Sequence, residues 1–105
     1  MSDRELLEFA AKAAGLHRCE NYYTDAAGNH VDWNPLADDG DALRLMVRLR
    51  LEPRFIDNSH SNGAEPSRVT LHNFAGIVEN IDGDPLAATR RAIVRAAAEI
   101  GRQTP

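Results

Sequence analysis

The sequence is poor in cysteine, lysine and aromatic residues, and it has no long apolar run. One cysteine, Cys19, excludes an internal disulfide framework and is typical of a reducing compartment. No stretch approaches the roughly 18 consecutive apolar residues of a membrane-spanning helix, and the first residues lack the pattern of a signal peptide. These absences favour a cytoplasmic protein with no membrane partner.

The charge balance also limits the partners. Sixteen acidic residues outweigh twelve basic ones, so the formal net charge is −4. A negative chain is poorly suited to coating nucleic acid. Aromatic residues make up only 6% of the chain and do not interleave with the arginines, as they do on surfaces that bind single strands. Nucleic acid is therefore a poor fit as a partner.

The residues that are present predict a single α+β domain spanning residues 1–105. Hydrophobic residues make up 43% and charged residues 27%, as in ordinary globular proteins. The order of periodic segments predicts a small layered sandwich of order α-β-β-α-β-β-β-α. In it, three helices pack with a mostly antiparallel sheet of about four to five short strands.

Helices are predicted at residues 2–15, 39–51 and 85–101. Ser2 and Glu5 have the spacing of a capping box, and Asp84 followed by Pro85 is typical of a helix start. Gly15 should end the first helix and Gly101 should loosen the end of the last. The expected inward residues are Leu43, Met46, Val47 and Leu51 in the second helix, and Leu86, Ile93, Ala97 and Ile100 in the third.

The strands are expected in two groups. A hairpin joins residues 18–23 to residues 29–33 around the turn at 25–28. Further strands are expected at 54–56, 68–72 and 77–81, with a bend at 73–76. Residues 57–66 read as a flexible polar loop and residues 102–105 as a short polar tail.

Two motifs carry a family resemblance. Residues 33–45 read WNPLADDGDALRL, and residues 84–93 read DPLAATRRAI. Together with the N-terminal helix, these motifs resemble the small phage and prophage proteins grouped as the phage ABA sandwich domain, and they are distantly similar to the Nin-region X proteins of lambdoid phages. The resemblance implies a layered α+β fold in a phage-encoded protein of the bacterial cytoplasm. It implies no catalytic residues.

The acidic residues suggest a metal site, but their spacing does not support one. Counting an EF-hand loop from Asp38 or Asp39 places leucine or arginine at position twelve, where a bidentate glutamate is required. The run from Asn80 to Asp84 also fails, because Pro85 replaces the required glycine and Arg91 stands at position twelve. We therefore expect these acids, with Asp41, to cap helix N-termini.

A zinc site is likewise disfavoured. His17, Cys19, His60 and His72 supply suitable ligand types, but no two of them form a tightly spaced pair of the kind that zinc sites use. No basic cluster surrounds Cys19 to mark it as a reactive thiolate. We expect no metal and no cofactor.

The arginines are the main candidates for a binding site. Arg91 and Arg95 lie one helical turn apart beside Arg90, and Arg44 and Arg48 form a similar pair. Guanidinium groups bind phosphates and carboxylates through two parallel hydrogen bonds, so a nucleotide-like ligand or an acidic partner would suit them, with His72 as a further candidate. The alternative interpretation is a solvated helix face that balances the acidic residues.

Trp33 and the two tyrosines have similar alternatives. Trp33 either covers the start of the second helix or belongs to an exposed binding or dimer surface. Tyr22 and Tyr23 are neighbours in a strand, so one of them should point outward.

Two hypotheses for the function remain. The first, favoured because no nucleophile–base or metal motif is present, is a non-catalytic module that binds a host or phage protein, or itself as a homodimer. The second is a small-molecule binder or enzyme that acts on a nucleotide-like ligand through the arginines. An enzyme whose catalytic group is assembled only in three dimensions is a third alternative.

Overall fold

The computed structural model describes residues 1–20, 22–57 and 67–104. Within these residues the chain has the expected α+β class, with three helices and six strands in the order α-β-β-β-α-β-β-β-α. The helices are α1 (Asp3–Ala13), α2 (Asp39–Leu49) and α3 (Pro85–Gln103). The strands are β1 (His17–Arg18), β2 (Tyr23–Thr24), β3 (His30–Val31), β4 (Pro53–Ile56), β5 (Arg68–Leu71) and β6 (Phe74–Asn80).

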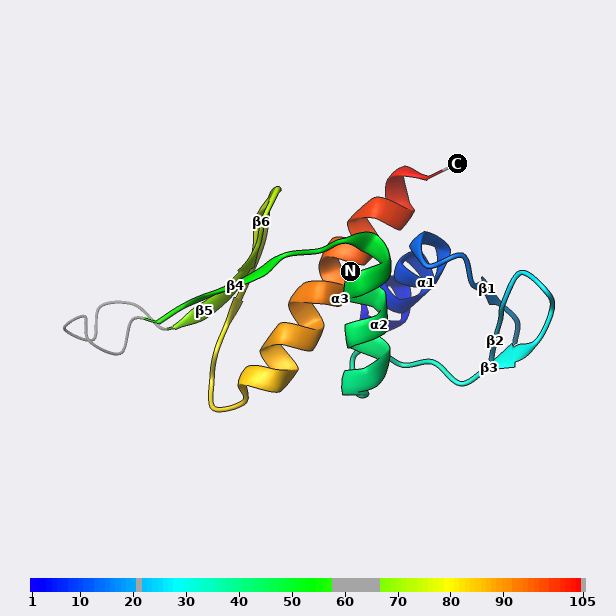
Figure 1. The fold of residues 1–105 in the computed structure, drawn as a ribbon, viewed down its shortest axis with the longest axis horizontal. Helices are drawn as coiled ribbons and strands as arrows, with labels where there is room; N and C mark the ends of the chain where they lie inside the picture. The colour runs from blue at the N-terminus through cyan, green and yellow to red at the C-terminus, as the bar shows by residue number, and fades with distance from the viewer. Residues whose placement is uncertain (21, 58–66, 105) are drawn as a thin grey trace.

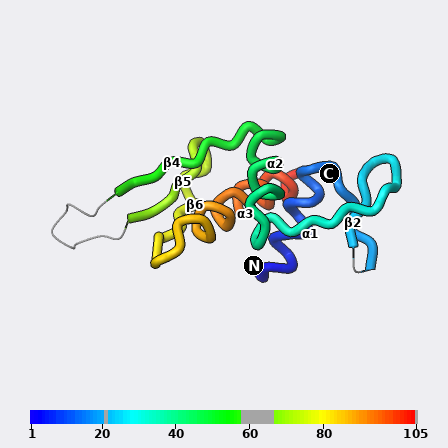
Figure 2. The backbone as a smooth tube through the Cα atoms, turned by 60° about the horizontal axis from the view of Figure 1, so that its bottom comes forward, coloured from blue at the N-terminus to red at the C-terminus, as the bar shows by residue number. Residues whose placement is uncertain are grey.

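The strands form two antiparallel sheets instead of the single sheet expected from the sequence. One sheet has the order β1-β2-β3 and the other β4-β5-β6. They lie at opposite ends of the helical layer (Figure 1), and a second view shows the same separation (Figure 2). The strand predicted at 18–23 is divided into β1 and β2, because the chain reverses where the Cys19 N–H donates to the Tyr22 carbonyl oxygen at 2.8 Å.

The predicted turn at residues 25–28 is confirmed. The Asp25 carboxylate accepts hydrogen bonds from the backbone N–H groups of Asn29 at 2.9 Å and Ala27 at 3.0 Å. The Asn29 bond is the main reason that the pKa of Asp25 lies below its ordinary value. Gly28 follows with a φ of 85°, which glycine adopts without a steric cost.

The three helix starts follow the predicted caps. Ser2 accepts from the Glu5 N–H at 3.2 Å, and the Glu5 side chain reaches back to complete the capping box. Asp38 accepts from the Asp41 N–H at 2.8 Å, and Asp84 from the Ala87 N–H at 3.0 Å. These bonds satisfy N–H groups that have no partner within the helix.

The helix ends depart slightly from the predicted bounds. After α1 the chain turns at Gly15, with a φ of 76°. Helix α2 ends at Leu49, because Arg50 adopts the left-handed conformation with a φ of 57°. Pro53 then opens β4, an edge strand that tolerates a residue without an N–H. Helix α3 continues to Gln103, so the predicted tail begins later.

Helix α3 is the centre of the core. It packs against α1 on one side, α2 on another, and β5 and β6 on a third. Ala92, Val94 and Ala96 are fully buried, and Ile93 is buried as predicted. Leu86 is 60% exposed, so its predicted inward position is wrong and the buried stripe begins two residues later, at Ala88.

Gly101 is a packing residue of α3, not the loosened helix end expected from the sequence. A Cβ atom at this position would lie 1.8 Å from the carbonyl oxygen of Phe9 in α1. Only a residue without Cβ allows the two backbones to approach this closely. The contact between α1 and α3 therefore depends on Gly101.

The predicted inward face of the second helix is wrong in part: Leu51 is buried and Met46 packs against the core, as expected, but Leu43 and Val47 do not. Leu43 is 56% and Val47 54% exposed, whereas Ala42 and Leu45 are buried. The rotation follows from Asp41, which is only 8% exposed because its carboxylate accepts the Asn34 N–H at 2.9 Å. Anchoring this carboxylate against the preceding segment turns Ala42 and Leu45 toward the core and leaves Leu43 and Val47 in solvent.

Strands β5 and β6 are joined by a tighter turn than predicted. Leu71 pairs with Phe74, so β6 begins where a bend was expected, and Asn73 adopts a φ of 69°. The register then shifts before Thr70 pairs with Val78, which places an irregularity in β6. The expected loop at 57–66 lies outside the described residues from position 58 onward.

Candidate binding groove

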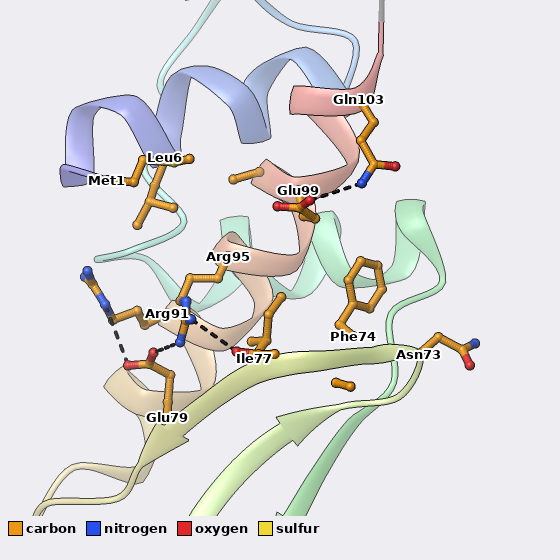
Figure 3. Close-up of a pocket in the computed structure, with 13 residues that line it drawn as sticks. Met1, Leu6, Asn73, Phe74, Ile77, Glu79, Arg91, Arg95, Glu99 and Gln103 are labelled. Carbon is orange, nitrogen blue, oxygen red and sulfur yellow. Dashed lines mark hydrogen bonds and ion pairs between the residues drawn. The ribbon is translucent and has the colours of Figure 1, made fainter.

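A groove of about 720 Å³ lies where α1 and β6 both pack against α3 (Figure 3). Leu6 of α1 forms one apolar wall, Phe74 and Ile77 of β6 form the other, and Ala98 of α3 contributes to the lining. Its volume is in the range of sites that hold ligands. Arg91 and Arg95, two of the predicted binding residues, belong to its lining.

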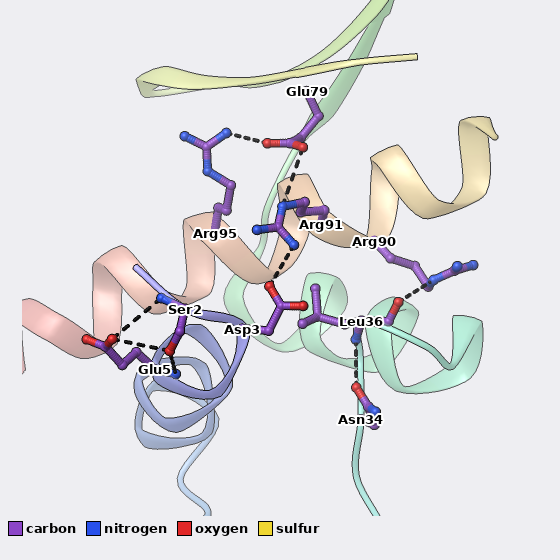
Figure 4. A network of polar contacts seen from close by, with 9 residues as sticks. All are labelled: Ser2, Asp3, Glu5, Asn34, Leu36, Glu79, Arg90, Arg91 and Arg95. Atoms are coloured by element: carbon purple, nitrogen blue, oxygen red, sulfur yellow. Dashed lines mark hydrogen bonds and ion pairs between the residues drawn. The ribbon is translucent and has the colours of Figure 1, made fainter. Parts of the chain in front are cut away.

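One carboxylate organises the charges of this groove. Glu79 of β6 forms an ion pair with Arg95, and its second oxygen lies 3.6 Å from Nε of Arg91. Arg91 also donates from Nη1 to Asp3 of α1 at 2.9 Å (Figure 4). The Glu79 side chain is only 19% exposed, so this is a partly buried cluster in which both guanidinium groups are held by carboxylates.

Arg95 also contacts the backbone of β6. Its Nη1 donates to the carbonyl oxygen of Val78 at 3.1 Å, and its Nη2 to that of Gly76 at 3.5 Å. Strand β6 is an edge strand, with β5 as its strand neighbour in the described part of the chain. Arg95 therefore supplies donors to an otherwise open sheet edge.

The other end of the groove is polar. Glu99 accepts hydrogen bonds from Arg102 at 2.7 Å and from Gln103 at 3.0 Å. The bond from Arg102 is the main reason that the pKa of Glu99 lies below its usual range. The groove thus has an apolar middle between two charged ends.

Glu79 was not among the residues selected from the sequence, although its pattern contains a signal. In β6 the side chains alternate, and Ile77 and Ile81 turn toward the core on the same side as Glu79. An acidic residue between two inward isoleucines needs a partner, because a buried unpaired charge is costly. The sequence could have indicated a paired carboxylate, but not which arginines pair with it.

Arg90 has a structural role away from the groove. Its Nε donates to the Leu36 carbonyl oxygen at 2.8 Å, and its Nη1 to Asp39 at 2.6 Å. The side chain is 18% exposed and connects α3 to the start of α2, as Figure 4 shows for the Leu36 bond. Asp39, considered as a metal ligand, is thus the partner of an arginine.

The remaining predicted basic residues lie on other surfaces. Arg44 is 72% exposed and pairs with Asp41 of its own helix at 2.6 Å. Arg48 lies against Gly15, and within the described residues no hydrogen bond or ion pair holds it. His72 lies in the β5–β6 turn, with Nε2 3.9 Å from Glu52. Of the predicted residues, the structure brings Arg91 and Arg95 together.

Trp33 belongs to a second, smaller hollow of about 300 Å³ on the β1-β2-β3 sheet. It is half-buried, with its ring edge-on to Tyr23 at 5.1 Å between centroids. One of the two tyrosines was expected to point outward, and it is Tyr22, which stacks on His30 at 4.9 Å between ring centroids. This surface is aromatic but shallow, and it lies on the far side of α1 from β6.

No group of three or more histidine, cysteine or acidic side chains is arranged to hold a metal ion within residues 1–20, 22–57 and 67–104. Cys19 is half-buried. His60, one of the zinc ligands considered, lies outside the described residues.

Comparison with family models, curated proteins and solved structures finds no match to this chain. The resemblance to the phage ABA sandwich domain therefore stays a prediction. Within the described part of the chain, no helix is long and apolar enough to cross a membrane.

Proposed function

We propose that this chain is a non-catalytic binding module, encoded by a phage or prophage, that acts in the bacterial cytoplasm by binding a host or phage protein. One observation carries the proposal. The two arginines of the groove are already held by Glu79 and Asp3, and an apolar surface lies beside them. A groove with apolar walls and internally balanced charges suits a polypeptide.

The same observation weighs against a nucleotide-like ligand. A phosphate bound by Arg91 and Arg95 would compete with Glu79, which is only 19% exposed. Displacing that carboxylate would leave a poorly solvated negative charge next to the phosphate. A phosphate that engages both arginines would thus leave Glu79 without a cation, which weighs against the nucleotide alternative.

Catalysis has similarly little support. His30 and Asp32 form a hydrogen-bonded pair at 3.1 Å, an arrangement that can orient a general base. The Asp32 side chain is fully exposed, however, and the pair lies on the open face of a sheet. Water at this site would screen the charges that a catalytic pair depends on.

A thermal shift experiment separates binding modes. A ligand at a hundred times its dissociation constant should stabilise the fold by about 2.7 kcal/mol. We expect no such shift with a panel of nucleotides. A nucleotide shift that disappears in Arg91→Gln would support the alternative and contradict the proposal.

Affinity capture tests the groove itself. Ala75→Arg places a long side chain in the groove from an exposed position, and Ala27→Arg makes the same change in the β2–β3 turn. We expect a host or phage protein to be retained by the wild type and by Ala27→Arg, and to be lost with Ala75→Arg. Equal retention by both variants would place the binding surface elsewhere.

A further inference from the structure

We infer that the occupant of the groove is an extended polypeptide segment that adds to β6 as a further strand and brings a carboxylate to Arg95. The inference rests on the proposed function and names its partner chemistry. It depends on three features: the open edge of β6, the hydrogen bonds of Arg95, and the position of α1.

The first feature is the direction of the backbone groups of β6. In an antiparallel pair, every second residue turns its N–H and C=O away from the neighbouring strand. The Ile81 N–H donates to the carbonyl oxygen of Ser67, which directly precedes β5. The backbone N–H and C=O groups of the odd-numbered residues at this end of β6 therefore point toward β5. The backbone groups of Val78, an even-numbered residue, point away from β5, and its carbonyl oxygen accepts a hydrogen bond from Arg95. Val78 therefore turns both backbone groups to the edge of β6 that faces away from β5, where Arg95 lies.

The second feature is that Arg95 occupies the place of an added strand. Its guanidinium N–H groups donate to the carbonyl oxygens of Val78 and Gly76, which are the acceptors that the N–H groups of a neighbouring strand would use. An incoming backbone can replace these donors. The guanidinium is then released to the carboxylate of the incoming segment, with Glu79 retained by Arg91.

The lining of the groove agrees with an extended chain. Gly76 leaves open space where a Cβ would stand, so the backbone of β6 is accessible. Leu6 and Phe74 provide apolar surface for side chains of the segment, which alternate along a strand. The segment should therefore combine apolar residues with an acidic residue near Arg95.

The third feature decides against a second copy of this chain. Leu6 and Met1 bound the groove opposite β6 (Figure 3), so a strand that pairs with β6 must fit between β6 and α1. A single extended segment needs about 5 Å beside its neighbour. The β6 strand of a second copy would bring its own α3 next to the first α3, on the side where α1 already packs against it.

The test uses the untagged chain and a displayed library of random linear octapeptides. We expect selected peptides to carry a carboxylate among apolar residues, and their binding to protect the Val78 amide from hydrogen exchange. Val78→Pro removes the N–H that faces away from β5 and should lower peptide affinity by about tenfold or more, whereas Val78→Thr keeps the N–H and the affinity. Both variants should fold, because this N–H is not used by β5.

A double-mutant cycle tests the carboxylate without depending on the proline variant. Changing the peptide carboxylate to an amide should weaken binding to the wild type by about tenfold, and should have no further effect on Arg95→Gln. If the losses of binding free energy caused by the two changes were additive, Arg95 would not be the partner of the peptide carboxylate.

Other outcomes of the selection overturn the inference and bear differently on the proposed function. Peptides that protect amides near Tyr22 from hydrogen exchange would show that β6 is not the docking edge. The chain would still be a binding module in that case. A peptide-free dimer with a protected Val78 amide would assign the edge to a second copy. No selected peptide, together with a nucleotide that stabilises the fold, would overturn both proposals.

Discussion

Gly101 and Gly76 differ in what a methyl group would meet at each position. At Gly101 an added Cβ would lie 1.8 Å from the Phe9 carbonyl oxygen, which belongs to the backbone of a packed helix and has no room to move aside. At Gly76 nothing lies within 4 Å of the same atom. The same substitution should therefore have opposite consequences at the two glycines.

We expect Gly101→Ala to lower the free energy of unfolding by about 3 kcal/mol or more, because α1 and α3 must separate to admit the methyl group. Gly76→Ala should leave it unchanged or raise it, since alanine loses less backbone entropy on folding. Urea denaturation of both variants measures the difference. Equal stabilities would mean that α1 and α3 do not approach at Gly101.

Asp41 shows how one carboxylate fixes the rotation of a helix. It accepts the Asn34 N–H and pairs with Arg44. Asp41→Leu should cost about 1–3 kcal/mol, since it leaves the Asn34 N–H without its acceptor. Asp41→Asn keeps a carbonyl acceptor and loses only an ion pair with a 72% exposed arginine, which contributes about 0–1 kcal/mol.

Thermal unfolding followed by tryptophan fluorescence measures the Asp41 variants, because Trp33 directly precedes Asn34 in the anchored segment. The expected order of stability is wild type, Asp41→Asn, Asp41→Leu. If the leucine variant were as stable as the wild type, the hydrogen bond to Asn34 would not determine the orientation of α2.

At the scale of elements, α3 offers a matched pair of positions. Ile93 is 3% exposed at the centre of the core, whereas Leu86 in the first turn is 60% exposed. Ile93→Asp would bury an unpaired charge and should destabilise the fold by several kcal/mol. Leu86→Asp places its charge in water near a positive helix N-terminus, so we expect a small effect.

Circular dichroism melting curves of Ile93→Asp and Leu86→Asp give the comparison. A large fall in melting temperature in both variants would show that Leu86 also faces the core, as predicted from the sequence. A negligible loss in Ile93→Asp would show that α3 is not the centre of the core.

Local signals predicted the elements well, while contacts between distant segments lay beyond the sequence. Ser2 and Asp84 were predicted as caps because a cap depends on residues three positions away. Leu43 was assigned to the core from the spacing of apolar residues, which contains no information on the hydrogen bond that holds Asp41 inward. The bridge of Glu79 between Arg91 and Arg95 joins a strand to a helix, and no spacing rule connects them.

At the scale of the whole molecule, the two sheets differ in how they are supported. The β4-β5-β6 sheet places Val69, Leu71 and Ile77 in the core against α3. The β1-β2-β3 sheet has strands of two residues and contributes Tyr23 as a buried side chain. A short sheet with one buried side chain should open locally without unfolding the rest, because few apolar contacts oppose that opening.

Native-state hydrogen exchange resolves this difference amide by amide. We expect the Thr24 amide to exchange at least about tenfold faster than amides in the middle of α3, since it needs only the local opening of a small sheet. Urea well below the unfolding midpoint should leave the Thr24 rate unchanged and accelerate exchange in α3, because local opening exposes little surface and global unfolding exposes much. If both amides showed the same protection and the same dependence on urea, the β1-β2-β3 sheet would unfold together with the core.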